Sequence, residues 1–372
     1  MSILFDSLLL SHTFKIVLIG SIFLGITSGV LGAFATLRKQ SLIGDAIAHA
    51  SLPGITVMFL FTQTKNTLLL LIGATIAGWL GTLFISLITN YSPIKKDAAL
   101  GITLSSFFGL GIVFLTVIQK LPTASKSGLD SFLFGNASTL LYNDIVIIGT
   151  LSLINITIVI LCWKEFKLIS FDPSFASSIG LSTKKIDTLL TLLIVTTIVI
   201  GLQTVGTILI STLIIAPAAA ARQWTDKLGN MVIIASIFGM IAGTGGSIIS
   251  SQFTKVPTGP TIVLIASFIV LISLLFAPNR GIIWEKIHRI LNKKTIQAET
   301  LLQKLYYLAL SHKDKTYAHY ISSLMAIENK HIETPLLRLK KQKLVHSPKK
   351  DHWGLTEPGI KYAKTLIEKA NK

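Results

Sequence analysis

The sequence predicts an all-α membrane protein with many spans, followed by a small basic domain that mixes helices with strands. Of its 372 residues, 51% are hydrophobic and only 14% are charged, whereas soluble domains carry about 25% charged residues. Apolar runs of roughly 20 residues, the length that crosses a bilayer, recur up to residue 277. From residue 280 onward, 19 Lys/Arg stand against 8 Asp/Glu and supply +11 of the net charge of +17. We therefore expect a transmembrane domain over 1–280 and a cytoplasmic domain over 295–372.

The apolar runs predict about nine transmembrane helices. The segment 186–221 holds 36 mostly apolar residues, too many for one ordinary span, and Gln203 and Gly206 interrupt it. Two crossings, at about 186–202 and 205–221, are preferred, and eight spans in all remain the alternative. The other predicted spans are 14–37, 41–61, 67–89, 98–118, 141–163, 231–250 and 259–277.

Basic clusters indicate the orientation. Arg38–Lys39, Lys95–Lys96 and Lys164–Lys167 follow the first, third and fifth spans. Because cytoplasmic loops are enriched in Lys and Arg, these clusters predict an N-terminus outside the cell. Two crossings within 186–221 then place Arg222, Lys227 and the C-terminus in the cytoplasm.

The second span, Ser41–Phe61, contains two ionisable side chains, Asp45 and His49. No other acidic residue or histidine lies as deep in an apolar run. Residues four apart share one face of a helix, and burying both groups in a membrane costs several kcal/mol. A functional pair is therefore preferred over the alternative, a pair that only holds helices together. Pro53 removes the backbone hydrogen bond to the carbonyl of His49, so Pro53 and Gly54 are predicted to form a kink or gate.

A short helix is predicted between the fifth and sixth spans, in the stretch FDPSFASSIG at 171–180. Asp172 suits the N-cap, Pro173 the first helical position and Gly180 the end. Local chemistry leaves two interpretations equally open, a capped loop helix and a lever that docks on a cytoplasmic partner. The residues assigned to docking are Phe171, Asp172, Pro173, Phe175, Ala176 and Gly180.

Three stretches together resemble the permease subunits of bacterial ABC importers for manganese, zinc or iron. They are SLIGDAIAHASLPG at 41–54, FDPSFASSIGL at 171–181 and QTVGTILISTLIIAPAAAA at 203–221. The resemblance covers roughly 14–280 and implies a fold related to the vitamin B12-type importers in the bacterial cytoplasmic membrane. It also implies a second permease subunit (the same chain or a sister permease), a separate ATP-binding subunit, an extracytoplasmic metal-binding lipoprotein and surrounding membrane lipid. No enzymatic activity and no permanently bound cofactor are then expected of this chain.

In such permeases the aspartate and histidine of the second span face the translocation path, which assigns Asp45 and His49 as metal ligands. A carboxylate oxygen with an imidazole nitrogen suits Mn²⁺, Fe²⁺ or Zn²⁺ better than Mg²⁺ or Ca²⁺. Two ligands are too few for tight binding, but two copies across a dimer axis supply four. The sequence does not choose among the three ions. The alternatives are a membrane-tethered metal-responsive regulator and a permease for a chelate such as a siderophore or cobalamin.

The C-terminal domain is predicted to contain helices over 296–311 and 316–327, a third helix opened by Thr334–Pro335, a hairpin over 345–356 and a last helix over 357–370. This order resembles a winged helix, whose third helix usually binds DNA. The basic residues there are Arg338, Lys340, Lys341 and Lys343. Cytoplasmic tails of membrane proteins are often basic for other reasons. Docking on the ATPase or a regulatory role is therefore preferred, and DNA binding is the less favoured alternative.

Overall fold

The computed structural model describes residues 12–40, 42–64, 66–120, 135, 140–253, 256–310, 316–320, 333–349 and 351–370. The chain divides into two compact units, one reaching Gly281 and the other beginning at Ile282. Each unit has its own hydrophobic core.

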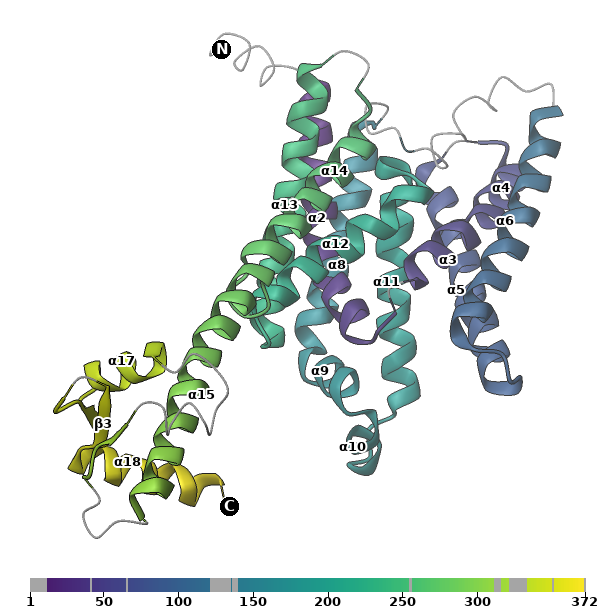
Figure 1. Ribbon diagram of the computed structural model, residues 1–372. Coiled ribbons are helices and arrows are strands. Elements are labelled where there is room, and N and C mark those ends of the chain that lie inside the picture. Colours follow the sequence, from purple (N-terminus) through teal and green to yellow (C-terminus); the bar gives the residue numbers. More distant parts are fainter. Residues whose placement is uncertain are drawn as a thin grey trace. The chain divides into compact units, whose positions relative to one another are not determined.

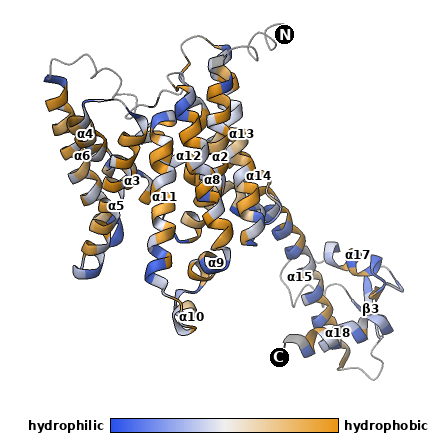
Figure 2. Ribbon diagram, turned by 180° about the vertical axis from the view of Figure 1, so that it is seen from behind, coloured by the Kyte–Doolittle hydropathy of each residue, from blue (hydrophilic) through white to orange (hydrophobic). Residues whose placement is uncertain are grey.

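All regular secondary structure among the described residues of the first unit is helical, and its long helices lie side by side (Figure 1). Figure 2 shows hydrophobic residues along these helices and hydrophilic ones gathered mainly at their ends. The helices are α2 (His12–Leu37), α3 (Ile43–Ala50), α4 (Leu52–Thr62), α5 (Thr67–Tyr91), α6 (Lys96–Lys120), α8 (Tyr142–Leu161), α9 (Trp163–Phe171), α10 (Pro173–Ser178), α11 (Thr183–Val205), α12 (Thr207–Trp224), α13 (Leu228–Gln252) and α14 (Thr258–Phe276).

Eight helical segments within the described residues are long and apolar enough to cross a membrane. They are α2, α3 with α4, α5, α6, α8, α11, α13 and α14, and α12 is not among them. The predicted break inside 186–221 is confirmed, because Gly206 separates α11 from α12 with φ 92° and ψ 166°. Only glycine adopts this backbone conformation at low cost.

Small residues let α2 and α13 cross in close contact. A Cβ on Gly25 would lie 2.3 Å from the carbonyl oxygen of Gly239, and one on Gly243 would lie 2.5 Å from that of Ser21. Membrane helices use such positions because close backbone approach maximises van der Waals contact between them. The glycine-rich run at 243–246 thus belongs to the interior of α13 and serves packing.

The second span is divided into α3 and α4 at Ser51, two residues before Pro53. Ser51 keeps helical dihedral angles, φ −75° and ψ −20°, so the division is a kink. It lies in the turn whose hydrogen bond a proline eliminates. Gly54 packs against α5, where a Cβ would lie 2.0 Å from the carbonyl oxygen of Gly73. This contact gives Gly54 a packing role of its own, while its gating role stays a prediction.

The second unit contains α15 (Ile282–Leu310), β1 (His319–Tyr320), α17 (Glu333–Lys341), β2 (Val345–His346), β3 (His352–Leu355) and α18 (Glu357–Ala370). The strands form an antiparallel sheet in the order β1-β3-β2. The predicted hairpin and last helix are confirmed, and the Thr356 hydroxyl accepts the Gly359 N–H at 3.2 Å at the start of α18.

One predicted element of this unit is wrong at its start. A helix was expected from Thr316 to Ile327, yet 316–320 hold a turn and then β1. The strand exists because His319 and Tyr320 pair with Trp353 and His352 of β3, a partner more than 30 residues away. The remainder of that prediction, 321–327, lies outside the described residues.

Candidate functional site

Asp45 and His49 lie one turn apart on α3, as the spacing predicts. The His49 Nε2 atom is 3.5 Å from the Asp45 Oδ1 atom. The Asp45 side chain is 42% exposed and that of His49 is 15% exposed. Within this chain the pair is therefore open on one side, with the carboxylate the more accessible of the two groups.

The open side is a single stripe of α3. The other residues of this helix are buried, whereas Leu42, Asp45 and His49 follow one helical face and are at least partly exposed. Behind the stripe, the His49 ring packs edge-on against the Phe108 ring of α6, with centroids 4.8 Å apart. The His49 Nδ1 atom is buried and has no hydrogen-bond partner among the described residues. Packing against Phe108 instead fixes the ring.

The pair supplies two metal-binding groups. Within the described part of the chain, no group of three or more His, Cys, Asp or Glu side chains is close enough to hold a metal ion. Two ligands leave positions for water or for a second subunit. The geometry therefore allows a weak or shared ion site.

Several other polar residues of the spans form hydrogen bonds within their own helix or to a neighbouring helix, whereas the buried Gln203 Oε1 atom has no partner among the described residues. The Ser28 hydroxyl donates to the carbonyl of Gly25 at 3.0 Å, and that of Thr204 donates to the carbonyl of Gly201 at 3.0 Å. The Asp144 carboxylate, which is more buried than that of Asp45, accepts from the Thr67 hydroxyl at 2.6 Å and caps α8. These contacts indicate structural roles.

The short helix α10 has the predicted ends. The Asp172 carboxylate accepts the Phe175 N–H at 2.9 Å, and Pro173 opens the helix. Gly180, at φ 86°, ends it, because its N–H donates to the carbonyl of Ser177 and the next N–H donates to that of Ala176. Figure 1 shows α10 in the connection between α9 and α11.

Every residue of α10 except Ala176 is exposed, and the exposed side chains at this turn include two aromatic rings. The Phe175 side chain is 53% exposed and Phe171 beside it 54%, whereas Ala176 faces inward and is buried. Two exposed aromatic rings beside a capped turn are compatible with docking on a partner, and this role stays a prediction.

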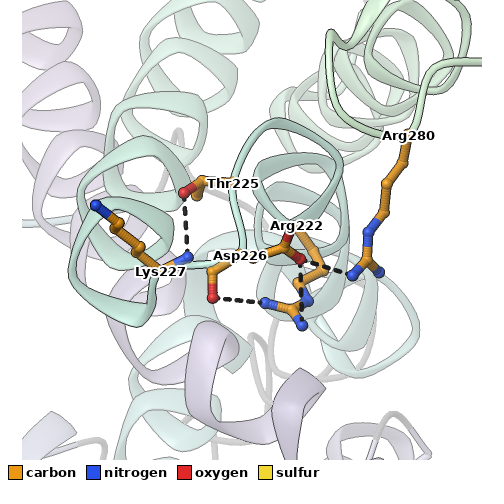
Figure 3. Close-up of polar contacts among 5 residues, drawn as sticks. All are labelled: Arg222, Thr225, Asp226, Lys227 and Arg280. Atoms are coloured by element: carbon orange, nitrogen blue, oxygen red, sulfur yellow. Dashed lines mark hydrogen bonds and ion pairs between the residues drawn. The ribbon is translucent and has the colours of Figure 1, made fainter. Parts of the chain in front are cut away.

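Asp226 joins three segments at one end of the bundle (Figure 3). Its carboxylate accepts from the Arg280 guanidinium at 2.6 Å and lies 3.6 Å from the Arg222 Nη2 atom. The Arg222 Nη1 atom also donates to the backbone carbonyl of Asp226 at 3.2 Å. Sequence reasoning used Arg222 only as a sign of orientation and missed the carboxylate that ties the ends of α12 and α14 together.

The comparisons with known proteins agree with this arrangement. A model of the ABC 3 transport family matches residues 11–277. The chain belongs to this family. It is the membrane-spanning permease subunit of an ABC transporter and not the ATPase.

Relatives and solved structures extend the likeness over the first unit. The manganese transport system membrane protein MntC of Bacillus subtilis is 46% identical over 290 residues, which cover 78% of this chain and 67% of that protein. The zinc transport system membrane protein TroC of Treponema pallidum is 43% identical and is covered to 92%, over 74% of this chain. The structure of PsaBC from Streptococcus pneumoniae in complex with Fab matches with a TM-score of 0.67 and 35% identity, over 74% of this chain and 96% of that one.

A metal-chelate type ABC transporter in an inward-facing conformation matches with a TM-score of 0.54 and 12% identity, over 70% of this chain and 85% of that one. At this identity the likeness concerns the fold alone.

Proposed function

We propose that this permease imports a divalent transition metal, manganese or zinc, with iron as the third candidate. The observation that carries the proposal is the Asp45–His49 pair on the one stripe of α3 that the chain leaves open. One hard oxygen and one borderline nitrogen favour these ions over Ca²⁺ and Mg²⁺. The names of the manganese and zinc relatives support the same choice.

The pair acts as half of an ion site. A second permease subunit that presents its own Asp45 and His49 across a symmetry axis completes four ligands. The partial exposure of the Asp45 carboxylate supports this arrangement, because a site sealed within one chain would bury it. A shell shared between subunits also releases its ion when the subunits separate, which an importer requires.

The ion enters the cytoplasm in this proposal, with the N-terminus outside, the C-terminus inside and α12 as the ninth crossing. Arg38 at the end of α2 pairs with Asp187 at the start of α11. Ala33 of α2 and Ala221 of α12 belong to one small core cluster. The end of α12 therefore lies at the level where α11 begins, which supports a full crossing and agrees with the expectation that the basic clusters lie on one side.

The ATP-binding subunit docks on α10 in this proposal. The exposed Phe171 and Phe175 rings supply an apolar anchor, and the Asp172 cap holds the turn rigid. An extracytoplasmic lipoprotein delivers the ion to the opposite side. Family membership supports both partners, since an ABC permease works with an ATPase.

Metal uptake by proteoliposomes that hold the full complex tests the ion site. We expect Asp45→Asn and His49→Ala each to abolish uptake of Mn²⁺ or Zn²⁺, since either variant leaves one ligand per subunit. Asp97→Asn and His288→Ala remove the same groups at exposed positions and should leave uptake unchanged. Normal uptake by either pair variant, with verified insertion, would refute the ligand assignment. Competition among Mn²⁺, Zn²⁺ and Fe²⁺ identifies the ion, and uptake of a chelate alone would favour the chelate alternative.

For the second unit we propose docking on the ATPase or a regulatory role. DNA binding is the second candidate, because a basic helix precedes a strand hairpin as in a winged helix. Two of its basic side chains already have partners within the unit. Arg338 donates to the Thr295 hydroxyl at 3.0 Å, and the Lys340 ammonium lies 5.7 Å from the Trp353 ring centre. Salt-sensitive, sequence-selective binding in a mobility-shift assay with residues 290–372 would reverse this preference.

A further inference from the structure

A basic pocket of about 480 Å³ opens at the end of the first unit where α2 finishes and α11 begins. Its polar walls come from the turn after α2, the end of α9 and the first turns of α11. The residues on which the inference depends are Arg38, Lys39, Ser170, Thr183, Lys184 and Asp187. Pro173, which opens α10, lines the same pocket.

The pocket carries an excess of positive charge. Arg38, Lys39 and Lys184 contribute three cations, and Asp187 contributes the one carboxylate among its lining residues. The Arg38 side chain is only 12% exposed and forms an ion pair with Asp187. Desolvation by burial lowers the pKa of Arg38, but a guanidinium stays protonated at neutral pH. After this pairing, Lys39 and Lys184, both exposed, remain without a carboxylate of their own among the lining residues.

Lys39 holds a backbone conformation that favours glycine. Its φ is 55°, and it occupies the left-handed position of a helix-ending motif in which its N–H donates to the Thr36 carbonyl and that of Gln40 donates to the Ala35 carbonyl. A residue with a Cβ is less stable than glycine in this conformation. The chain thus places a lysine at the pocket where glycine would be more stable, which points to a use for the side chain.

We propose that this pocket binds a phosphate group, as the headgroup of an anionic phospholipid or as free phosphate. The Lys39 and Lys184 ammonium groups and the Thr183 hydroxyl line one pocket and suit a compact anion with several acceptor oxygens, whereas the Ser170 hydroxyl already donates to the Phe166 carbonyl at 2.6 Å. The pocket lies where two membrane helices end, the level at which lipid headgroups sit, and basic pockets between helices bind such headgroups. This phosphate site is separate from the proposed metal site. Only the side of the membrane on which it lies, the cytoplasmic leaflet, rests on the proposed topology.

The position beside Pro173 gives a bound phosphate a structural consequence. An anion between Lys39 and Lys184 bridges the end of α2 to the start of α11, which flank the connection that carries α10. Phosphate binding would therefore restrict the movement of α10, the helix proposed to dock on the ATP-binding subunit.

Binding of short-chain phosphatidylglycerol to the purified full chain in neutral detergent tests the site, with phosphatidylcholine and inorganic phosphate as parallel arms. Near a membrane surface each basic residue is worth about 1 kcal/mol, so we expect Lys184→Gln and Lys39→Gly each to weaken phosphatidylglycerol binding about fivefold. Lys39→Gly relieves backbone strain, so it should not lower the thermal stability of the chain. Lys185→Gln is the matched control, because Lys185 is exposed beside Lys184 but does not line the pocket.

Each outcome decides the proposal. Selective loss of phosphatidylglycerol binding in the two pocket variants supports a lipid site. Binding of inorganic phosphate with the same variant pattern, and no preference for phosphatidylglycerol over phosphatidylcholine, supports a free-phosphate site. Equal weakening by Lys185→Gln would overturn the proposal in favour of general surface attraction. Unchanged binding of phosphatidylglycerol and of inorganic phosphate by the two pocket variants would also overturn it. If these variants then lost association with the ATP-binding subunit, the pocket would be a protein contact instead.

Discussion

Replacing Gly25 by alanine should separate two helices at the centre of the permease. The new Cβ would lie 2.3 Å from the carbonyl oxygen of Gly239 and 2.6 Å from its carbonyl carbon. Ordinary van der Waals contact begins at 3.4 Å, so α13 must move away from α2 by about 1.1 Å at this crossing. Both opposing atoms are backbone, so no side-chain rotation relieves the clash. Overpacking of this kind costs about 1–3 kcal/mol, and at a backbone contact we expect the upper end.

Thermal unfolding of the purified full chain measures this effect. Gly101→Ala and Gly109→Ala on α6 are matched controls, because a Cβ at either position has no heavy atom within 4 Å. Alanine also favours helix over glycine by about 0.5–1 kcal/mol, so the controls should unfold at the same temperature or higher. We expect Gly25→Ala to lower the midpoint by several degrees, with reduced metal uptake. A midpoint equal to that of the controls would refute the inference that this crossing depends on backbone contact.

Two further predictions concern the docking helix and the second unit. Asp172→Ala removes the acceptor of the Phe175 N–H and should destabilise α10 by about 1 kcal/mol. We expect this variant to associate more weakly with the ATP-binding subunit while it inserts normally into the membrane. Undiminished association would count against docking on α10. The Tyr362 hydroxyl donates to Glu299 at 3.0 Å, and this hydrogen bond, with a smaller contribution from desolvation, raises the pKa of Tyr362. Stabilisation from a raised pKa is complete below the ordinary value of about 10 and is lost as pH rises through the folded value. Tyr362→Phe should therefore flatten the fall in stability of this unit above pH 10 in urea titrations, and an unaltered pH profile would show that the bond is not formed.

The sequence was enough to predict those helices and helix ends that are determined by residues within or next to them. A span depends on the length of an apolar run, so α5 and α13 follow the predicted 67–89 and 231–250 closely. The ends of α10 depend on Asp172, Pro173 and Gly180, all within the helix or next to it. The shared face of Asp45 and His49 depends only on a spacing of four residues.

Contacts between distant segments were not predictable in this way. Phe108 lies nearly 60 residues after His49, and no local pattern selects it from the other aromatic residues of the spans. Arg38 was read as a marker of orientation, yet it is largely buried against Asp187. β1 was expected as part of a helix because its pairing partner, β3, is remote in sequence.

The packing around α3 bears on how an ion passes the pair. A Cβ on Gly78 of α5 would lie 2.8 Å from the Ser51 hydroxyl oxygen, and one on Gly81 would lie 2.8 Å from the Ala50 Cβ atom. On another side, α3 packs against α12, where a Cβ on Gly44 would lie 3.4 Å from Ser211. A helix fitted this closely to its neighbours cannot flex at Pro53 without moving them. If the predicted gate at Pro53 and Gly54 opens, α5 and α12 must therefore move with it, and access to the Asp45–His49 stripe then changes through a concerted movement of several helices.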